Sequence, residues 1–309
     1  MKILFISRSK GNGDISSVVK AQAKSLEKHA DISFYIIRGQ GIFSYFKAVW
    51  GIRKYMKKNK IDIVHAHYAL CGFVASFSTS KSIVCSLMGS DIEDYWIGRI
   101  LIRLFNALSW DDVIIKSQRL KEKIKLRKAH IIPNGINMDV FIPLGKATSR
   151  KRLGFSDDEK HVVFIADPER KEKKFSLAKQ ACDMAGKQIK LNLVVINNLP
   201  HTEIVYYLSA ADALILTSHF EGSPNVIKEA MACNCPIVST DVGDVKEVIG
   251  KTDGCYITTY EPEDVADKIK LALEFGRRTN GREKIHHLDE KVIAQKISDL
   301  YVSLINKPK

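Results

Sequence analysis

Short apolar runs alternate with amphipathic stretches along the whole chain. The runs are continuous and not polar at every second position, which predicts parallel strands buried on both faces of a sheet. They lie at 2–7, 32–37, 62–68, 83–87, 112–116, 161–166, 191–196, 213–217 and 236–239. Helical patterns such as 16–29 and 201–211 separate them. This order predicts an α/β protein with doubly wound parallel sheets, and 309 residues suffice for two such domains.

One strand, helix, strand unit carries the most chemistry. Ala213–Thr217 is its first predicted strand. Ser223 is a good N-cap, and Pro224 suits the first helical position. Asn234 can adopt the left-handed conformation that ends a helix, and Pro236 prevents its continuation. A helix starting at the carboxyl end of a parallel strand predicts an anion site there.

Two glutamates flank this helix start. Glu221 lies just before the helix, and Glu229 lies in its second turn. Carboxylates beside an anion site fit a ligand that also offers hydroxyls, such as a phosphate that bears sugars on both sides. The alternative is that two glutamates at this spacing are ordinary surface residues.

The sequence of residues 219–243, HFEGSPNVIKEAMACNCPIVSTDVG, is more specific than the spacing of its glutamates. It resembles the glutamate-x7-glutamate signature of the retaining, nucleotide-sugar-dependent glycosyltransferases of family 4, which have the GT-B fold. The resemblance implies that Glu221 faces the donor sugar and that Glu229 holds the ribose hydroxyls. The residues between them would lie along the sugar and diphosphate; they are Gly222, Ser223, Pro224, Asn225 and Val226. The family usually has Gly at the position of Asn234, and Asn tolerates the same conformation.

Other loops match the family's donor site less closely. The charged loop after 161–166 resembles one that clamps the donor diphosphate through an arginine and a lysine, here Arg170 and Lys173, with Lys174 as the substitute if the register differs by one. Ala166–Asp167 replaces the family's usual glycine-arginine pair, and a solvated surface loop is the alternative. Asn197 follows the next strand, where the family places the nucleotide base.

A glycine loop follows the first strand of the chain. Gly11-x-Gly13 lacks the third glycine of a dinucleotide fingerprint, so a tight turn without a ligand is an alternative. Family 4 enzymes often have a glycine-rich loop here that faces the cleft, which favours a donor-binding role for Gly13.

Two residues of the first half are acceptor-side candidates. His67 ends an apolar strand and resembles the family's His-x-His segment, with a structural histidine as the equal alternative. Asp91 follows the strand at 83–87 in a loop where the family reads His-Gly-x-Asp, but Met88 replaces that histidine. Asp91 and Glu93 mimic an acidic metal-binding pair, yet the resemblance implies a reaction without metal or other cofactor.

The resemblance also implies the domain organisation. We expect GT-B, with two Rossmann-like doubly wound parallel-sheet domains facing a cleft. Residues 1–145 would bind the acceptor, and residues 153–289 the nucleotide-sugar. The polar, basic stretch 145–152 would be the linker. The final helix, within 290–309, is expected to pack back on the first domain.

The net charge of +13 and pI near 9.3 favour an anionic partner surface. No zinc-finger, RRM or recognition-helix pattern appears, so nucleic acid is not expected. Basic residues mix with aromatic ones near 43–60 and 96–128, as in helices that lie on anionic bilayers. A helix packed on the core with a solvated basic face is the alternative.

The N-terminus predicts a strand and not a signal peptide, and no apolar run approaches the length of a membrane span. Six cysteines lie mostly in apolar runs, typical of buried thiols, and Cys233 and Cys235 lack the second ligand pair of a zinc site. We therefore expect a cytoplasmic protein, peripheral on the inner face of the plasma membrane.

The expected function is transfer of a sugar from a UDP- or GDP-sugar to a hydroxyl of a glycan or lipid-linked acceptor, with retention and without metal, in cell-surface polysaccharide synthesis. A nucleotide-sugar 2-epimerase with the same fold is one alternative. A non-catalytic nucleotide-sugar-binding protein is the other, motivated by the charge and by Met88.

Overall fold

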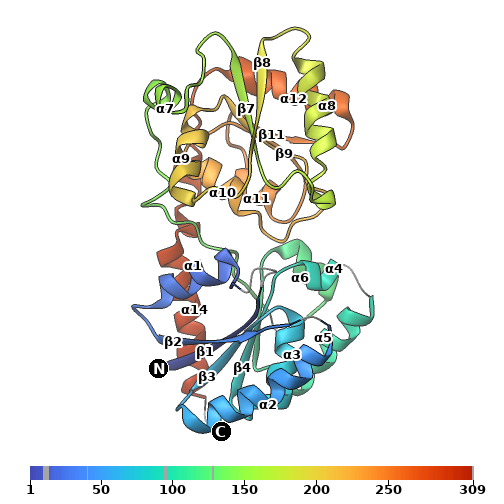
Figure 1. Ribbon diagram of the computed structural model, residues 1–309, viewed down its shortest axis with the longest axis vertical. Helices are drawn as coiled ribbons and strands as arrows, with labels where there is room; N and C mark the ends of the chain where they lie inside the picture. Colours follow the sequence, from blue (N-terminus) through green and yellow to red (C-terminus); the bar gives the residue numbers. More distant parts are fainter. Residues whose placement is uncertain (10–13, 40, 94–95, 127–128, 308–309) are drawn as a thin grey trace. The chain divides into compact units, whose positions relative to one another are not determined.

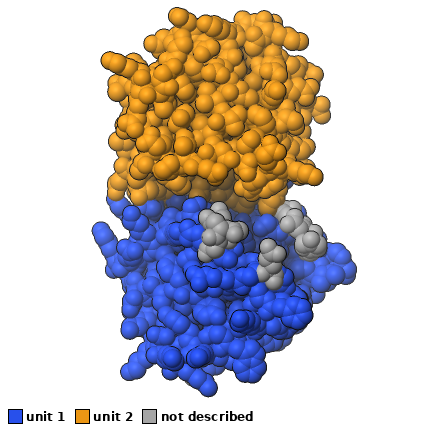
Figure 2. All heavy atoms as spheres, in the orientation of Figure 1, with its two compact units in different colours: residues 1–135, 290–309 blue, residues 136–289 orange. Residues whose placement is uncertain are grey.

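The computed structural model describes residues 1–9, 14–39, 41–93, 96–126 and 129–307. The chain forms two compact units (Figure 2). The first consists of Met1–Gly135 and Glu290–Lys309, and the second of Ile136–Asp289.

A six-stranded parallel sheet forms the centre of the first unit, in the order β2-β1-β3-β4-β5-β6. Its strands are β1 (Lys2–Arg8), β2 (Asp31–Ile37), β3 (Ile63–His67), β4 (Ser82–Leu87), β5 (Asp112–Ile115) and β6 (His130–Ile131). Strands β3, β4 and β5 are buried almost throughout, as their continuous apolar runs predict.

Helices cover both faces of this sheet (Figure 1). On one face α1 (Ser17–Leu26) packs against α14 (Glu290–Ile305), and both contribute to a core with β1 and β3. On the other face α2 (Phe43–Lys58) packs against α3 (Ala69–Ser78), which also contacts α5 (Trp96–Leu108). Two shorter helices, α4 (Ser90–Glu93) and α6 (Gln118–Ile124), follow β4 and β5. Helix α3 was not foreseen from the sequence.

The second unit has a five-stranded parallel sheet in the order β11-β10-β9-β7-β8. Its strands are β7 (Lys160–Ile165), β8 (Leu191–Ile196), β9 (Ala213–Leu216), β10 (Ile237–Thr240) and β11 (Cys255–Thr258). Its helices are α7 (Lys146–Leu153), η1 (Lys171–Lys173), α8 (Phe175–Ala185), α9 (His201–Ala210), α10 (Asn225–Ala232), α11 (Val245–Ile249), α12 (Pro262–Phe275), α13 (Gly281–Lys284) and η2 (His286–Leu288). One core joins the sheet to α8 and α12, and another joins it to α9, α10 and α11.

Both sheets have the same connectivity. In each, the first strand lies between the second strand, which forms one edge of the sheet, and the third strand, which lies toward the other edge. The chain therefore reverses direction across the sheet between β1 and β3, and again between β7 and β9. In open parallel sheets, ligands bind where the loops after two such strands diverge. This rule singles out the loops after β1 and β3 in the first unit, and after β7 and β9 in the second.

The predicted linker at 145–152 is wrong. This stretch forms helix α7, and the division between the units lies at Gly135. Helix α7 is fixed to the second unit because the buried Arg150 guanidinium lies 2.7 Å from the Asp212 carboxylate. Met138 and Phe141, upstream of α7, already lie in the core of the second unit.

The last helix completes the core of the first unit. Ile293, Ile297 and Tyr301 of α14 are buried against β1 and β3. The Tyr301 hydroxyl lies 2.5 Å from Nδ1 of His65, in the middle of β3. Among the described residues, no helix is both long enough and apolar enough to cross a membrane.

Candidate active site

The loops after β7 and β9 meet in an ion pair. Lys173, at the end of η1, places its Nζ 2.5 Å from Oε1 of Glu221, and Ser218 donates a hydrogen bond to the same oxygen at 2.8 Å. The two charged side chains are only 13% and 17% exposed, so bulk water screens their attraction weakly. Two predicted site residues, 48 positions apart, are thus brought together.

Backbone contacts hold the two loops in register. The Thr217 hydroxyl lies 3.0 Å from the carbonyl oxygen of Lys173 and 3.1 Å from that of Lys174, to which it can donate. The amide of His219 donates to the carbonyl of Glu172 at 2.8 Å. Lys173 is therefore positioned by its backbone as well as by its ion pair.

The predicted capping role of Ser223 is wrong. Helix α10 begins at Asn225, one residue later than expected, and the Ser223 hydroxyl turns away from it to donate to Asp244 at 2.6 Å. Lys228, fully buried in α10, donates to the same hydroxyl at 2.5 Å. A buried ammonium requires hydrogen-bond partners and a counter-charge, and Ser223 and Asp244 supply them.

The loop that carries Glu221 rests against a glycine. Gly243 follows β10 with a φ of +59°, and a Cβ there would lie 2.9 Å from the carbonyl oxygen of Gly222. The backbone of Gly222 is predicted to lie along the sugar and diphosphate. Gly243 packs directly against it, and only glycine permits so close a contact.

Two buried acceptor groups on α10 are candidate ligand contacts. Oδ1 of Asn225 is buried and accepts no hydrogen bond within the described part of the chain. The Glu229 carboxylate, one turn later on the same face, is also buried, and Nδ1 of His201, whose pKa burial lowers, lies 3.7 Å from its Oε1. Buried acceptors without donors are costly, so both groups fit a ligand that supplies N–H or O–H donors.

Burial controls the protonation of Glu229. It raises the pKa of the carboxyl group from 4.5 to about 7, and the positive charge of Lys228 opposes this shift. The group is consequently poised between its neutral and charged forms near neutral pH. Hydroxyl groups that donate to it would favour the charged form.

The other predicted donor-side residues lie nearby in the chain but are engaged differently. Arg170 is exposed and bonds to Glu172 at 2.5 Å. Lys174 has a φ of +45°, and its ammonium lies 4.7 Å from the centre of the Tyr260 ring. Asn197 is exposed after β8, and Val226 is half-buried against the core. Sequence reasoning missed Ser218, Lys228 and Tyr260, because no motif marks their contacts with Glu221, Asp244 and Lys174.

The first unit has a cavity of about 540 Å³ at its own strand reversal. Arg8 and Ser9 line it after β1, and Tyr68 and Ala69 after β3. Tyr45 of α2 also lines it and lies 2.5 Å from the Arg8 guanidinium. The sequence analysis missed Arg8, Tyr45 and Tyr68. Gly13, which was predicted to face the ligand from the β1 loop, lies outside the described residues.

Asp91 lines this cavity, but its carboxylate is occupied. It accepts hydrogen bonds from the backbone amides of Ala69 at 3.0 Å, Met88 at 3.1 Å and Gly89 at 2.9 Å. Burial raises its pKa, and these amides oppose the shift. Asp91 therefore ties the loop after β4 to the start of α3, which favours a positioning role over direct acceptor binding.

His67 lies in the core and not on the cavity wall. Its ring is fully buried and stacks on His65 at 4.5 Å. Burial, with a contribution from Lys116, lowers the pKa of His67 to about 3, so the ring is neutral. The structure thus separates His67 from the cavity lining, and neither of its ring nitrogens has a hydrogen-bond partner among the described residues.

Two family models match the chain in succession. The model described as Glycosyltransferase Family 4 matches residues 18–140, and that described as Glycosyl transferases group 1 matches residues 148–291. These two matches, with the relatives below, support a glycosyltransferase of the family 4 type. The first match falls mostly in the first unit, and the second covers the loops that carry Lys173, Glu221 and Glu229.

Individual relatives agree with this family. The chain is 28% identical to TuaC of Bacillus subtilis, named for teichuronic acid biosynthesis, over 71% of this chain and 63% of that protein. It is 25% identical to N-acetyl-alpha-D-glucosaminyl L-malate synthase of Bacillus anthracis, over 77% of this chain and 74% of the relative. The chain spans less than two thirds of TuaC, and 64% of an uncharacterised glycosyltransferase of Methanocaldococcus jannaschii.

Solved structures show the same fold. Sucrose-phosphate synthase of Thermosynechococcus elongatus superposes with a TM-score of 0.80 at 18% identity, covering 98% of both chains. HepE of Anabaena, solved in complex with UDP, gives 0.79 at 16% identity, covering 98% of this chain and 100% of HepE. The expected fold class is confirmed: two parallel-sheet α/β units of the GT-B type.

Proposed function

We propose that this family 4 chain is a retaining, metal-independent glycosyltransferase. It transfers a sugar from a nucleotide-sugar, with UDP or GDP as the nucleotide, to a hydroxyl of a glycan or lipid-linked acceptor in cell-surface polysaccharide synthesis. The observation that carries the proposal is the site on the second unit's sheet edge, where the Lys173–Glu221 ion pair lies before a helix that carries the unpartnered Oδ1 of Asn225 and the buried Glu229 carboxylate.

This site suits the two chemical faces of a nucleotide-sugar. The first amides of α10 and the Lys173 ammonium offer hydrogen bonds and positive charge to a diphosphate. The unpartnered Oδ1 of Asn225 and the buried Glu229 carboxylate can accept hydrogen bonds, which ribose and sugar hydroxyls supply. UDP-glucose bound to HepE is a precedent for such a ligand in this fold.

The proposed mechanism follows from the charge that develops during transfer. The bond between the anomeric carbon and the diphosphate oxygen breaks, which leaves positive charge on the sugar and negative charge on the diphosphate. Lys173 and the start of α10 stabilise the diphosphate. Arg170 can also bind the diphosphate only if it gives up its bond to Glu172. Glu221 positions the sugar and supports its positive charge.

Retention requires attack from the face that the diphosphate leaves. The acceptor hydroxyl forms the new bond to the anomeric carbon, and its proton passes to an oxygen of the departing diphosphate. Neither step calls on a group outside the substrates and these side chains.

The first unit is proposed to bind the acceptor and to contact an anionic membrane at the cytoplasmic face. Phe43 and Trp50 of α2 are 82% and 71% exposed, and Trp96 and Leu108 of α5 are 66% and 77% exposed. Such large apolar residues among exposed lysines and arginines fit the interface of a bilayer.

A binding and turnover panel tests the proposal. UDP-, GDP- and ADP-sugars are titrated into the native chain and into Glu229→Ala with EDTA present, and released sugar is analysed with and without candidate acceptors. Selective binding that Glu229→Ala abolishes is expected. Epimerised product without acceptor would identify an epimerase, binding without turnover would identify a binding protein, and absence of binding would overturn the proposal.

A further inference from the structure

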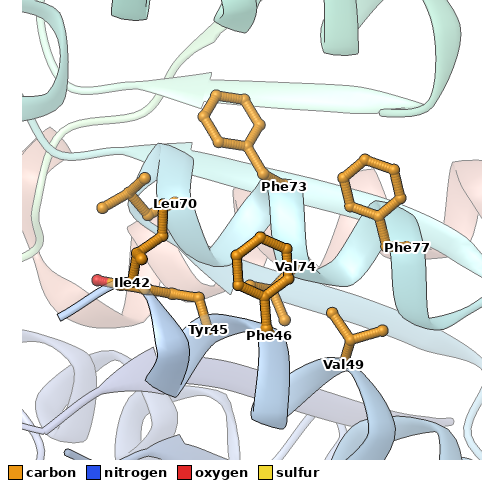
Figure 3. Close-up of a pocket in the computed structure, with 8 residues that line it drawn as sticks. All are labelled: Ile42, Tyr45, Phe46, Val49, Leu70, Phe73, Val74 and Phe77. Atoms are coloured by element: carbon orange, nitrogen blue, oxygen red, sulfur yellow. The ribbon is translucent and has the colours of Figure 1, made fainter. Parts of the chain in front are cut away.

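An apolar groove runs along the surface of the first unit between α2 and α3. Its volume is about 180 Å³. Figure 3 shows its eight lining side chains, four from α3 and four from α2 and the residue that precedes it. They are Ile42, Tyr45, Phe46, Val49, Leu70, Phe73, Val74 and Phe77.

The groove leaves large apolar side chains in contact with water. Ile42 is 65% exposed, Phe46 63%, Leu70 51% and Phe77 59%. Apolar surface gathered in this way on a soluble domain marks a binding surface, because its exposure costs about 25 cal/mol per Å². The shape and composition of the groove fit a hydrocarbon chain.

The groove joins the cavity at the strand reversal. Three residues, Tyr45, Leu70 and Phe73, line both spaces. Beyond them the lining becomes polar, with Arg8, Ser9, Ser16 and Asp91 around the cavity. One continuous site therefore has an apolar end at the surface and a polar end at the loop after β1, where Arg8 supplies a positive charge.

Exposed cations lie along α2, the helix that forms one wall of the groove. They follow α2 on the side that faces water and comprise Lys47, Arg53, Lys54, Lys57 and Lys58. Negatively charged head groups of a bilayer would complement this helix, so a hydrocarbon chain can enter the groove directly from a membrane.

We propose that the groove holds the hydrocarbon chain of a membrane-borne acceptor, while the acceptor's anionic head lies in the cavity beside Arg8. This rests on the proposed function and narrows its acceptor to the lipid-linked class. The length of the hydrocarbon chain would set the affinity for the acceptor, because each buried methylene group strengthens binding roughly fourfold.

Alkyl phosphates of four to twelve carbons, below their micelle concentrations, are the probes. Isothermal titration into the native chain is expected to show affinity rising about fourfold for each added carbon until the groove is full. Val49→Trp fills the groove from a half-exposed position and should remove this dependence on chain length. The matched control Leu101→Trp, at an exposed position on α5 outside the groove, should retain it.

The outcomes separate this inference from the proposed function. Nucleotide-sugar binding, measured on the same preparations, should be equal in all three proteins; its absence would count against the proposed function alone. If the affinity for alkyl phosphates did not change with the number of carbons, or if it changed equally in Val49→Trp, the assignment of the groove would be overturned. Sedimentation that shows a dimer disrupted by Val49→Trp would assign the groove to an interface between copies and also overturn it.

Discussion

Gly243 approaches the carbonyl oxygen of Gly222 so closely that no side chain fits between them. The contact joins the loop after β10 to the loop that carries Glu221. Support of a reactive loop by a second loop makes the geometry of the site sensitive to a single added methyl group.

Gly243→Ala is therefore expected to lower donor affinity and turnover at least tenfold, besides costing about 1 kcal/mol for the left-handed backbone. Gly154→Ala is the matched control, since Gly154 also has a positive φ, +68°, but open space around its Cβ position. Urea unfolding and donor kinetics of both variants provide the test. Equal loss of activity in the two variants would contradict a role for the Gly222 contact.

Lys173→Met and Glu221→Gln should each reduce kcat on the order of a hundredfold, because each removes a charge proposed to act in the transition state. Lys171→Met changes an exposed lysine of the same short helix and should leave kcat nearly unchanged. Steady-state kinetics with a saturating donor distinguish these effects from weaker binding. Native turnover in Glu221→Gln would remove Glu221 from the mechanism.

Glu229 makes the stability of the ligand-free protein depend on pH. Its pKa in the folded state, about 7, lies above the ordinary 4.5, so its contribution is fully present below pH 4.5 and is lost as pH rises through 7. The free energy of unfolding should fall by roughly 3 kcal/mol over this range. Glu229→Gln should lack this component when unfolding is measured from pH 5 to 8, and parallel curves for the two proteins would contradict the assignment.

Lys228→Met should destabilise the second unit by about 3–5 kcal/mol, because Asp244 would remain buried without its counter-charge. Adding Asp244→Asn should restore part of the lost stability. The double variant is therefore expected to lose less unfolding free energy than the two single variants lose together. Urea unfolding of the four proteins gives the coupling energy. Additive losses would show that the two charges do not stabilise each other.

Membrane contact is testable through the aromatic residues of α2 that lie outside the groove. Phe43→Ser with Trp50→Ser should lower binding to anionic vesicles at least tenfold, and added salt should weaken the remaining binding. Val302→Ser, at a 45% exposed position of α14, serves as the control. Co-sedimentation with anionic and neutral vesicles measures the effect, and equal binding to both kinds would exclude an electrostatic contribution.

The sequence predicted most of what local chemistry determines. The strand before Glu221, the helix after Pro224 and the left-handed Asn234 follow from apolar runs and backbone preferences, and the structure has all three. Family resemblance added the donor-site roles expected of Glu221 and of Lys173, which periodicity cannot supply, but their ion pair was not predicted.

The errors arose where a partner distant in sequence decides the local structure. Ser223 looks like a helix cap, but Lys228 and Asp244 occupy its hydroxyl. Residues 145–152 look like a linker, but the carboxylate of Asp212 anchors Arg150. Likewise, Arg8 and Tyr45 meet only because β1 and α2 fold together, so no motif marked their cavity.

The order in which the units can form differs from their order in the chain. The second unit is a single continuous stretch, whereas the core of the first needs α14, which is synthesised after the whole second unit. During translation the second unit can fold as soon as it leaves the ribosome, while the first unit waits with its α14-facing surface uncovered. The half of the protein that is made first would therefore need protection of its exposed apolar surface for the longest time.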